Sequence, residues 1–118
     1  MTKIVRTPRD WLSDIVAWGD QIAVYLEGID EDAFLVDRLR QDAVVRCIEC
    51  VGEASRNILK DQRSADLLHL ELYQAYWARN RVAHGYYDLS MERVWETATV
   101  SIPRLVADAR SMLEQLRD

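Results

Sequence analysis

Hydrophobic residues recur at steps of three and four along most of the chain, which is the spacing of amphipathic helices. The first such stretch begins after Thr7 and Pro8, since threonine caps a helix and proline suits its first turn. Asp10 places negative charge in that turn, where it is favourable, and Gly28 marks the predicted end of the helix. The apolar stripe comprises Trp11, Ile15, Trp18, Ile22, Tyr25 and Ile29.

A second, longer helix is predicted from Asp30 to about Lys60 or Asp61, with acidic residues at its start. Its apolar residues are too widely spread for one narrow stripe, so two buried faces are expected. One face would pack in the bundle and the other on a partner subunit, although a helix central to one bundle would show the same pattern. These residues are Phe34, Leu35, Leu39, Val44, Val45, Ile48, Val51, Ile58 and Leu59.

The third predicted helix runs from about Glu71 to His84, and Gly85 is its expected C-terminal residue. It is preceded by the one long connection, from Asp61 to about Leu70. Within this connection, residues 64–68 could form a short extra helical turn.

A fourth helix is predicted from Met91 to about Leu116, capped by Ser90. Pro103 lies inside it and removes one backbone donor, so a kink is expected there rather than an end. The apolar stripe is regular and comprises Met91, Trp95, Ala98, Ile102, Leu105, Ala109, Met112 and Leu116.

These four helices predict an all-α, up-and-down four-helix bundle with a kinked last helix. The 118 residues suit one domain, 1–118, and only four glycines and two prolines leave few turns. No strand alternation, repeat or low-complexity tract is present. The broad apolar stripes favour a homodimer.

The net charge of −5 excludes nucleic-acid binding by bulk charge, so any contact with RNA must be local. Residues 1–6 lack the apolar core of a signal peptide, and no apolar run is long enough to cross a membrane. The few cysteines fit a reducing compartment, and a cytoplasmic protein is expected. No cofactor is expected.

The segment from Leu72 to Tyr87 contains no Asp or Glu, although the chain is acidic. It carries two arginines, one of the two histidines and half of all the aromatic residues. A basic and aromatic segment in an acidic protein is where an anion, most simply a phosphate, is expected to bind.

On an ideal helix Asn80 and His84 share a face, with Tyr76 and Tyr87 close to the same stripe. Arg79 lies five residues before His84, roughly 140° around the helix. Arg79 therefore either bends back toward His84 or works beside a His84 from a second subunit, in a composite site at a two-fold axis.

These residue types suit RNA cleavage by an attacking 2′-hydroxyl. Histidine can exchange the proton near neutral pH, and arginine can stabilise the phosphate as negative charge develops. Asn80 could orient the phosphate or the imidazole, and the scheme requires no metal. The simpler alternative is a surface salt bridge or a cation at a helix C-terminus.

The run from Arg79 to Tyr86 resembles the motif of the HEPN superfamily, and of its HepT toxins in particular: Arg, usually Asn, three further residues, His, any residue, Tyr. The resemblance extends to residues 43–58, with Gly52-Glu53-Ala54 at their centre, and to the last helix at Val94-Trp95 and residues 102–105. It covers nearly the whole chain in the right order. Trp77 departs from it, since many members carry glycine there, and Glu71-Leu72 stands where Pro-Trp is frequent.

The resemblance implies an all-α dimer that places two motifs together as a metal-independent ribonuclease. By matching positions, Arg79 and His84 would be catalytic and Asn80 supportive. It also implies a partner, an MntA-like minimal nucleotidyltransferase antitoxin, which transfers AMP from ATP to Tyr86. The added anionic group would block RNA entry, and Tyr87 could compete as acceptor.

Several other residues have both a functional and a simpler interpretation. Glu53 could pair with Arg79 or Arg81, or be an ordinary surface glutamate. Cys47 and Cys50 have metal-ligand spacing, but one pair within a helix favours buried apolar roles. His69 is expected to be solvated. Two further groups are the basic residues Arg46, Arg56, Lys60 and Arg63, read as an RNA path or as solvated charges, and the tryptophans Trp11, Trp18 and Trp95, read as core or interface anchors.

Two alternatives to a ribonuclease stay open at this level. The same fold could be a catalytically inactive module that binds a nucleotidyltransferase as partner and acceptor. It could also be a structural helical dimer that uses its aromatic segment as an interface.

Overall fold

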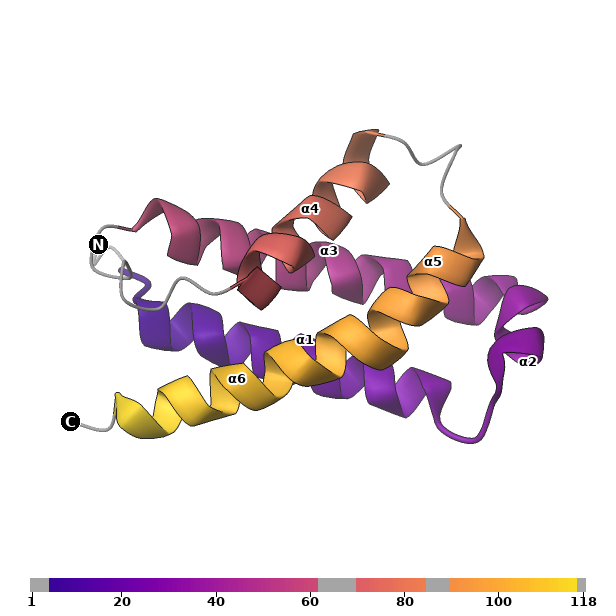
Figure 1. The fold of residues 1–118 in the computed structure, drawn as a ribbon, viewed down its shortest axis with the longest axis horizontal. Coiled ribbons are helices and arrows are strands. Elements are labelled where there is room, and N and C mark those ends of the chain that lie inside the picture. The colour runs from indigo at the N-terminus through magenta and orange to yellow at the C-terminus, as the bar shows by residue number, and fades with distance from the viewer. Residues whose placement is uncertain (1–4, 62–69, 85–89, 117–118) are drawn as a thin grey trace, which may run out of the picture.

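The computed structural model describes residues 5–61, 70–84 and 90–116, and every regular element within these ranges is helical (Figure 1). The predicted all-α fold is thereby confirmed. The predicted turn at residues 64–68 and the helix end at Gly85 lie outside the described residues. None of the described helices has the length and apolar character needed to cross a membrane. The elements are α1 (Pro8–Leu26), α2 (Glu31–Leu35), α3 (Arg38–Lys60), α4 (Leu70–His84), α5 (Met91–Glu96), a π-helical turn (Thr97–Ser101) and α6 (Ile102–Gln115).

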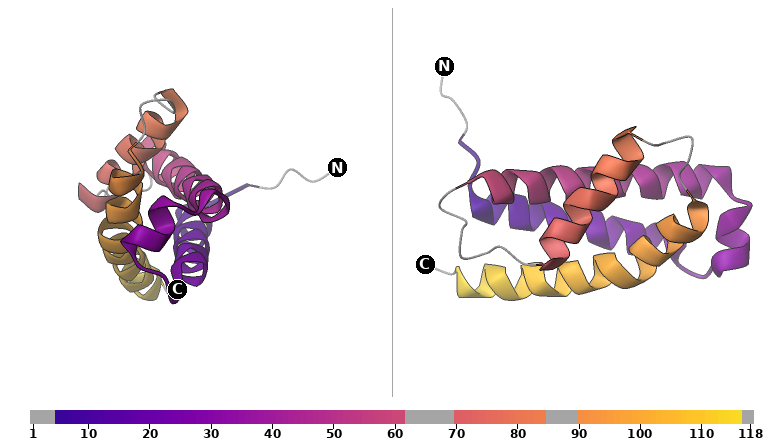
Figure 2. Two further views of the ribbon diagram at one scale, coloured as in Figure 1. Left: turned by 90° about the vertical axis from the view of Figure 1, so that its right-hand side faces the viewer. Right: turned by 45° about the horizontal axis from the view of Figure 1, so that its top comes forward.

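Helix α1 packs along α3 on one side and along α6 on the other, while α4 crosses the outer side of α3 obliquely (Figures 1 and 2). Fully buried apolar side chains from all of these helices meet in one core. The largest of them are Leu12, Ile15, Ile22, Phe34, Ile48, Ile58, Leu72, Ile102 and Leu105.

The predicted ends of α1 are confirmed. The Thr7 backbone N–H donates to the Asp10 carboxylate at 2.9 Å, and the Asp10 N–H donates to Thr7 Oγ1 at 3.3 Å. The Asp10 carboxylate accepts from the Thr7 N–H and also from Thr7 Oγ1 at 3.1 Å, and both bonds favour its ionised form and lower the pKa of Asp10. At the other end, Gly28 has φ 78°, which favours glycine and follows the last helical residues.

The predicted stripe of α1 is confirmed at Ile15 and Ile22, but Leu12 and Gly19 are also buried and Trp18 is exposed. The side that faces the core carries Leu12, Ile15, Gly19 and Ile22. Gly19 faces α6 so closely that a Cβ at this position would overlap Val106 Cγ2 and lie 3.3 Å from Ile102 Cγ2. The missing side chain at Gly19 therefore allows α1 and α6 to pack closely.

The tryptophans occupy different environments as a result. Trp18, predicted as an anchor, is 37% exposed, because its neighbour Gly19 takes the inward position. Trp11 is partly buried against the core. Trp95 packs on Phe34 of α2 with ring centroids 5.4 Å apart, as expected for a core aromatic.

The prediction of one continuous second helix is wrong. The helix breaks after Leu35, and Asp37 starts α3 by accepting a hydrogen bond from the Arg40 N–H at 3.1 Å. The Asp37 carboxylate also pairs with the Arg40 guanidinium at 2.6 Å. Because the chain turns here, Leu39, predicted to be buried, is 81% exposed.

The predicted kink in the last helix occurs as a π-helical turn just before Pro103 (Figure 2). Proline has no N–H to donate to the Thr99 carbonyl, so regular α-helical bonding fails there. The Ile102 N–H instead reaches the Thr97 carbonyl five residues back, and Thr99 Oγ1 donates to the Trp95 carbonyl at 2.7 Å. The helix thus changes direction without ending.

The contact at Gly19 predicts a specific pattern of stability changes. Gly19→Ala should lower the free energy of unfolding by about 1–3 kcal/mol, since the added Cβ overlaps Val106. In a Val106→Ala background the same change should be neutral or stabilising, because alanine favours helix over glycine by about 1 kcal/mol. Urea unfolding of the four proteins measures this coupling. An equal cost of Gly19→Ala in both backgrounds would contradict the assigned contact.

Candidate functional site

Helix α4 presents one side to α3, and this side carries the first residue of the motif. Leu72 and Ala75 are buried on it, with 0% and 6% of their surface exposed. Arg79 follows Ala75 by four residues and therefore lies on the same side. The packing of α4 on α3 accordingly directs Arg79 onto α3.

Gly52 of α3 receives the aliphatic part of Arg79. A Cβ at Gly52 would overlap Cβ and Cγ of Arg79 and would lie 3.2 Å from the Ala75 carbonyl oxygen. No side chain larger than hydrogen fits there unless α4 moves. Gly52 therefore sets how closely the backbone that carries Arg79 approaches α3.

Glu53, the next residue of α3, pairs with the charged end of Arg79. Its Oε2 lies 3.4 Å from Arg79 Nη2, and its Oε1 lies 3.9 Å from Arg56 Nη1. Of the two arginines predicted as partners of Glu53, Arg79 is the one that it contacts among the described side chains. One carboxylate bridges two guanidinium groups that come from different helices.

The cluster of Arg79, Glu53 and Arg56 remains accessible to solvent. The side chains of Arg79 and Glu53 are 27% and 47% exposed, and that of Arg56 is 37% exposed. Pairs this exposed add little to stability, so the contact orients the side chains more than it holds the fold. Two guanidinium groups around one carboxylate leave an excess positive charge that can attract a phosphate.

Only some of the other predicted site residues lie among the described side chains. Asn80 and Tyr76 are half-buried on α4. His84 is the last residue of α4, but its side chain and that of Arg81 lie outside the described residues. Tyr86 and Tyr87 also lie outside them, as do His69 and Arg63.

The basic residues of α3 that were predicted along an RNA path differ in their surroundings. Arg56 joins the cluster with Arg79 through Glu53. Arg46 and Lys60 are exposed on α3. Arg56 is therefore linked to the site through its contact with Glu53. The basic residues of α3 do not all share this contact.

Cys47 and Cys50 have the environment of apolar residues. Cys47 is buried and Cys50 is half-buried, and both thiols are free. Burial raises the pKa of Cys47 to about 11 and also raises that of Cys50, which keeps both protonated at neutral pH. Over residues 5–61, 70–84 and 90–116, no group of three or more His, Cys, Asp or Glu residues could hold a metal ion.

A sequence model of the family described as "Ribonuclease HepT-like" matches residues 19–112, which include Gly52, Glu53 and the whole of α4. The chain belongs to this family. The HepT resemblance of the motif and its flanking helices is thereby confirmed.

Relatives of the chain carry names that point the same way. "Probable ribonuclease HepT" of Thermococcus cleftensis is 33% identical over 95% of this chain and 97% of its own. "Putative RNase MJ0125" of Methanocaldococcus jannaschii is 28% identical over 96% of this chain and 97% of its own. No solved structure matches the chain significantly. The chain thus resembles relatives named as ribonucleases over nearly its whole length.

The contact between Gly52 and Arg79 is testable without any activity. Gly52→Ala should lower the free energy of unfolding by about 1–3 kcal/mol, because α4 must move away from α3. In an Arg79→Gly background, where the opposing Cβ and Cγ are absent, the same substitution should cost less. Urea unfolding of both pairs gives the coupling, and additive effects would contradict the contact.

Proposed function

We propose that this member of the HepT-like family is a metal-independent endoribonuclease toxin, with Arg79 and His84 as catalytic residues and Asn80 in support. The observation that carries the proposal is the guanidinium of Arg79, fixed on α3 by Glu53 at 3.4 Å yet partly open to solvent. Arg79 is also the first residue of a complete motif that ends at Tyr86. The proposed site of action is the cytoplasm.

The chemistry follows from these residue types. A ribose 2′-hydroxyl attacks the adjacent phosphorus and loses its proton, while the departing 5′-oxygen gains one. The products are a 2′,3′-cyclic phosphate and a 5′-hydroxyl end. His84 transfers protons, since imidazole titrates near neutral pH. Arg79 binds the phosphate oxygens as charge builds on them in the transition state.

Glu53 and Gly52 act on this chemistry through Arg79. The carboxylate of Glu53 holds the guanidinium in place before the phosphate arrives, so less freedom is lost on binding. Gly52 sets the distance of α4 from α3. We therefore assign positioning roles to both, with Arg81 and Tyr76 as further support beside the motif.

The spacing of the motif points to a homodimer. Arg79 and His84 lie roughly 140° apart around an ideal helix, so one α4 does not direct both toward a single phosphate. In a two-fold dimer each phosphate would meet Arg79 of one subunit and the partner subunit's His84. This arrangement makes two equivalent sites per dimer.

Mixing two inactive variants tests both the roles and the dimer. Arg79→Ala and His84→Ala should each reduce RNA cleavage in excess EDTA by about 10²–10⁴-fold. After subunit exchange, half of the dimers are mixed and each has one intact composite site. About a quarter of wild-type activity should return. Cleavage is followed on a labelled RNA, with intact mass recorded for each protein.

Three outcomes would count against these assignments. Full cleavage by His84→Ala would remove the proposed role of His84. Two inactive variants that stay inactive when mixed would place both groups in one subunit. Absence of cleavage by wild-type protein of unmodified mass would favour the alternative, an inactive module that binds a nucleotidyltransferase.

We further propose that an MntA-like nucleotidyltransferase antitoxin is the partner and Tyr86 its target. The phenol oxygen of Tyr86 would attack the α-phosphate of ATP, which forms the AMP ester and releases pyrophosphate. Tyr86 lies two residues after His84, so the bulky anionic group would repel RNA from the site. The toxin would thus be neutralised by charge and volume together.

Modification can be mapped by mass. Incubation with such a transferase and ATP should add AMP to the wild-type chain and to Tyr87→Phe, but not to Tyr86→Phe. Cleavage should fall in proportion to the modified fraction. Tyr76→Phe serves as a control on the same helix stripe. Modification of Tyr86→Phe at the wild-type rate would reassign the acceptor, with Tyr87 as the first candidate.

A further inference from the structure

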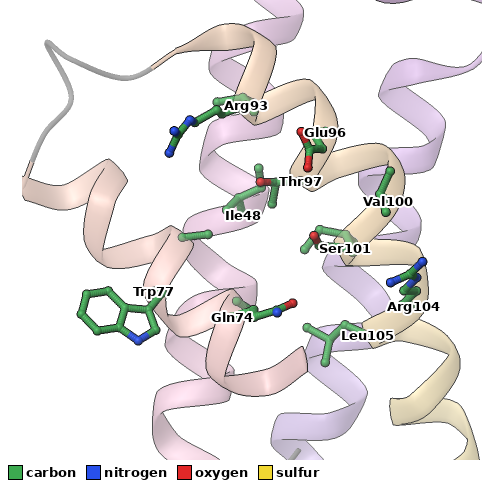
Figure 3. A pocket seen from close by; sticks show the side chains of 14 residues that line it. Ile48, Gln74, Trp77, Arg93, Glu96, Thr97, Val100, Ser101, Arg104 and Leu105 are labelled. Carbon is green, nitrogen blue, oxygen red and sulfur yellow. The ribbon is translucent and has the colours of Figure 1, made fainter. Parts of the chain in front are cut away.

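A pocket of about 530 Å³ that Arg79 does not line lies between α4 and the segment that runs from α5 through the π-helical turn into α6 (Figure 3). Its volume is within the range of small-ligand sites. Trp77 lines it and is two residues from Arg79, roughly 200° around the helix. One helix therefore borders two separate polar sites.

The pocket combines an apolar bed with polar walls. Ala75, Val94 and Leu105 are buried residues of the core that form part of its surface. Gln74 of α4 faces Thr97 and Ser101 across the space (Figure 3). An amide and two hydroxyl groups above an apolar surface can bind a flat, hydrogen-bonding ring.

The charges of the lining favour an anion at its edge. Arg93 and Arg104 are both exposed, and no ion pair between described residues engages either of them. Glu96 also lines the pocket, so the lining carries two positive charges and one negative charge. Arg93 extends over the gap toward α4 in Figure 3. A phosphate is therefore best placed beside Arg93 or Arg104 and away from Glu96.

The π-helical turn shapes this pocket. Thr97, Val100 and Ser101 all belong to the turn and all line the space. A π-helical turn is an uncommon feature that is frequent at functional sites. Here it follows from Pro103, which lies outside the lining but removes the N–H that would keep the helix regular. The kink and the pocket thus have one cause.

We propose that this pocket binds one nucleoside phosphate, with the base against the apolar bed and the phosphate on Arg93 or Arg104. The favoured source is an unpaired nucleotide of the RNA strand, and in this form the inference rests on the proposed ribonuclease function. The strand would cross α4, about 10 Å wide, between Arg79 and the pocket. The indole of Trp77, 55% exposed, is directed outward and offers a stacking surface for the neighbouring base.

Binding is measured by fluorescence anisotropy with a labelled 2′-O-methyl RNA strand, which lacks the attacking hydroxyl and cannot be cut. Arg93→Gln/Arg104→Gln should raise the Kd at least about tenfold, since both arginines that can bind the phosphate are removed. Ser101→Phe should raise it similarly by filling the pocket without a change of charge. The control Arg38→Gln/Arg110→Gln removes two charges away from the pocket and should change the Kd less than about twofold.

A titration with AMP separates the two sources of the ligand. AMP binding that is lost in Ser101→Phe, without strand binding, would assign the pocket to a free nucleotide. The inference is overturned if neither probe binds, or if the Kd of both pocket variants stays within twofold of wild type while thermal melting shows them folded. RNA cleavage by the wild-type chain is assayed separately. If the wild-type chain cleaves RNA but the pocket variants bind the strand with an unchanged Kd, only the inference about the pocket is overturned. If the wild-type chain does not cleave RNA, the proposed ribonuclease function is overturned.

Discussion

The close packing of α4 on α3 at Gly52 is the constraint on which the candidate site depends. Since Gly52 has no side chain, the backbone of α4 approaches until Cβ and Cγ of Arg79 cover the glycine. The guanidinium then reaches Glu53, the adjacent residue on α3. Two consecutive residues therefore control both the depth and the direction of Arg79, one by the absence of a side chain and one by charge.

A glycine also allows close packing between α1 and α6. Gly19 of α1 accepts Val106 of α6, as Gly52 accepts Arg79. With α1 held against both α3 and α6, the core fixes the last helical segment while α4 lies across the outside of α3 (Figure 1). The π-helical turn before Pro103 then shapes the wall opposite α4 (Figure 3). Two glycines and one proline thus position both polar sites around α4.

The proposed action on RNA requires an acidic chain to concentrate its positive charge. The net charge is −5, yet α4 and its neighbours gather Arg79 and Arg56 around Glu53, and Arg93 and Arg104 around the pocket. In the proposed function, local excess charge of this kind would give contact at chosen phosphates while the remaining surface repels nucleic acid. Such an arrangement favours selective over general binding.

The sequence by itself determined the helical class, the ends of α1, the start of α5 at Ser90, and the HepT-like motif, because caps, periodicity and motif spacing act within a few residues. It did not reveal the break at Asp37 or the exposure of Trp18 and Leu39, since an apolar residue does not show which side of its helix meets a neighbour. The tertiary structure decided that Glu53 contacts Arg79, one of the two partners expected for it, and only the tertiary structure brought Gln74 and Ser101 to the same pocket. These contacts link different helices, and their geometry depends on how closely the helices pack.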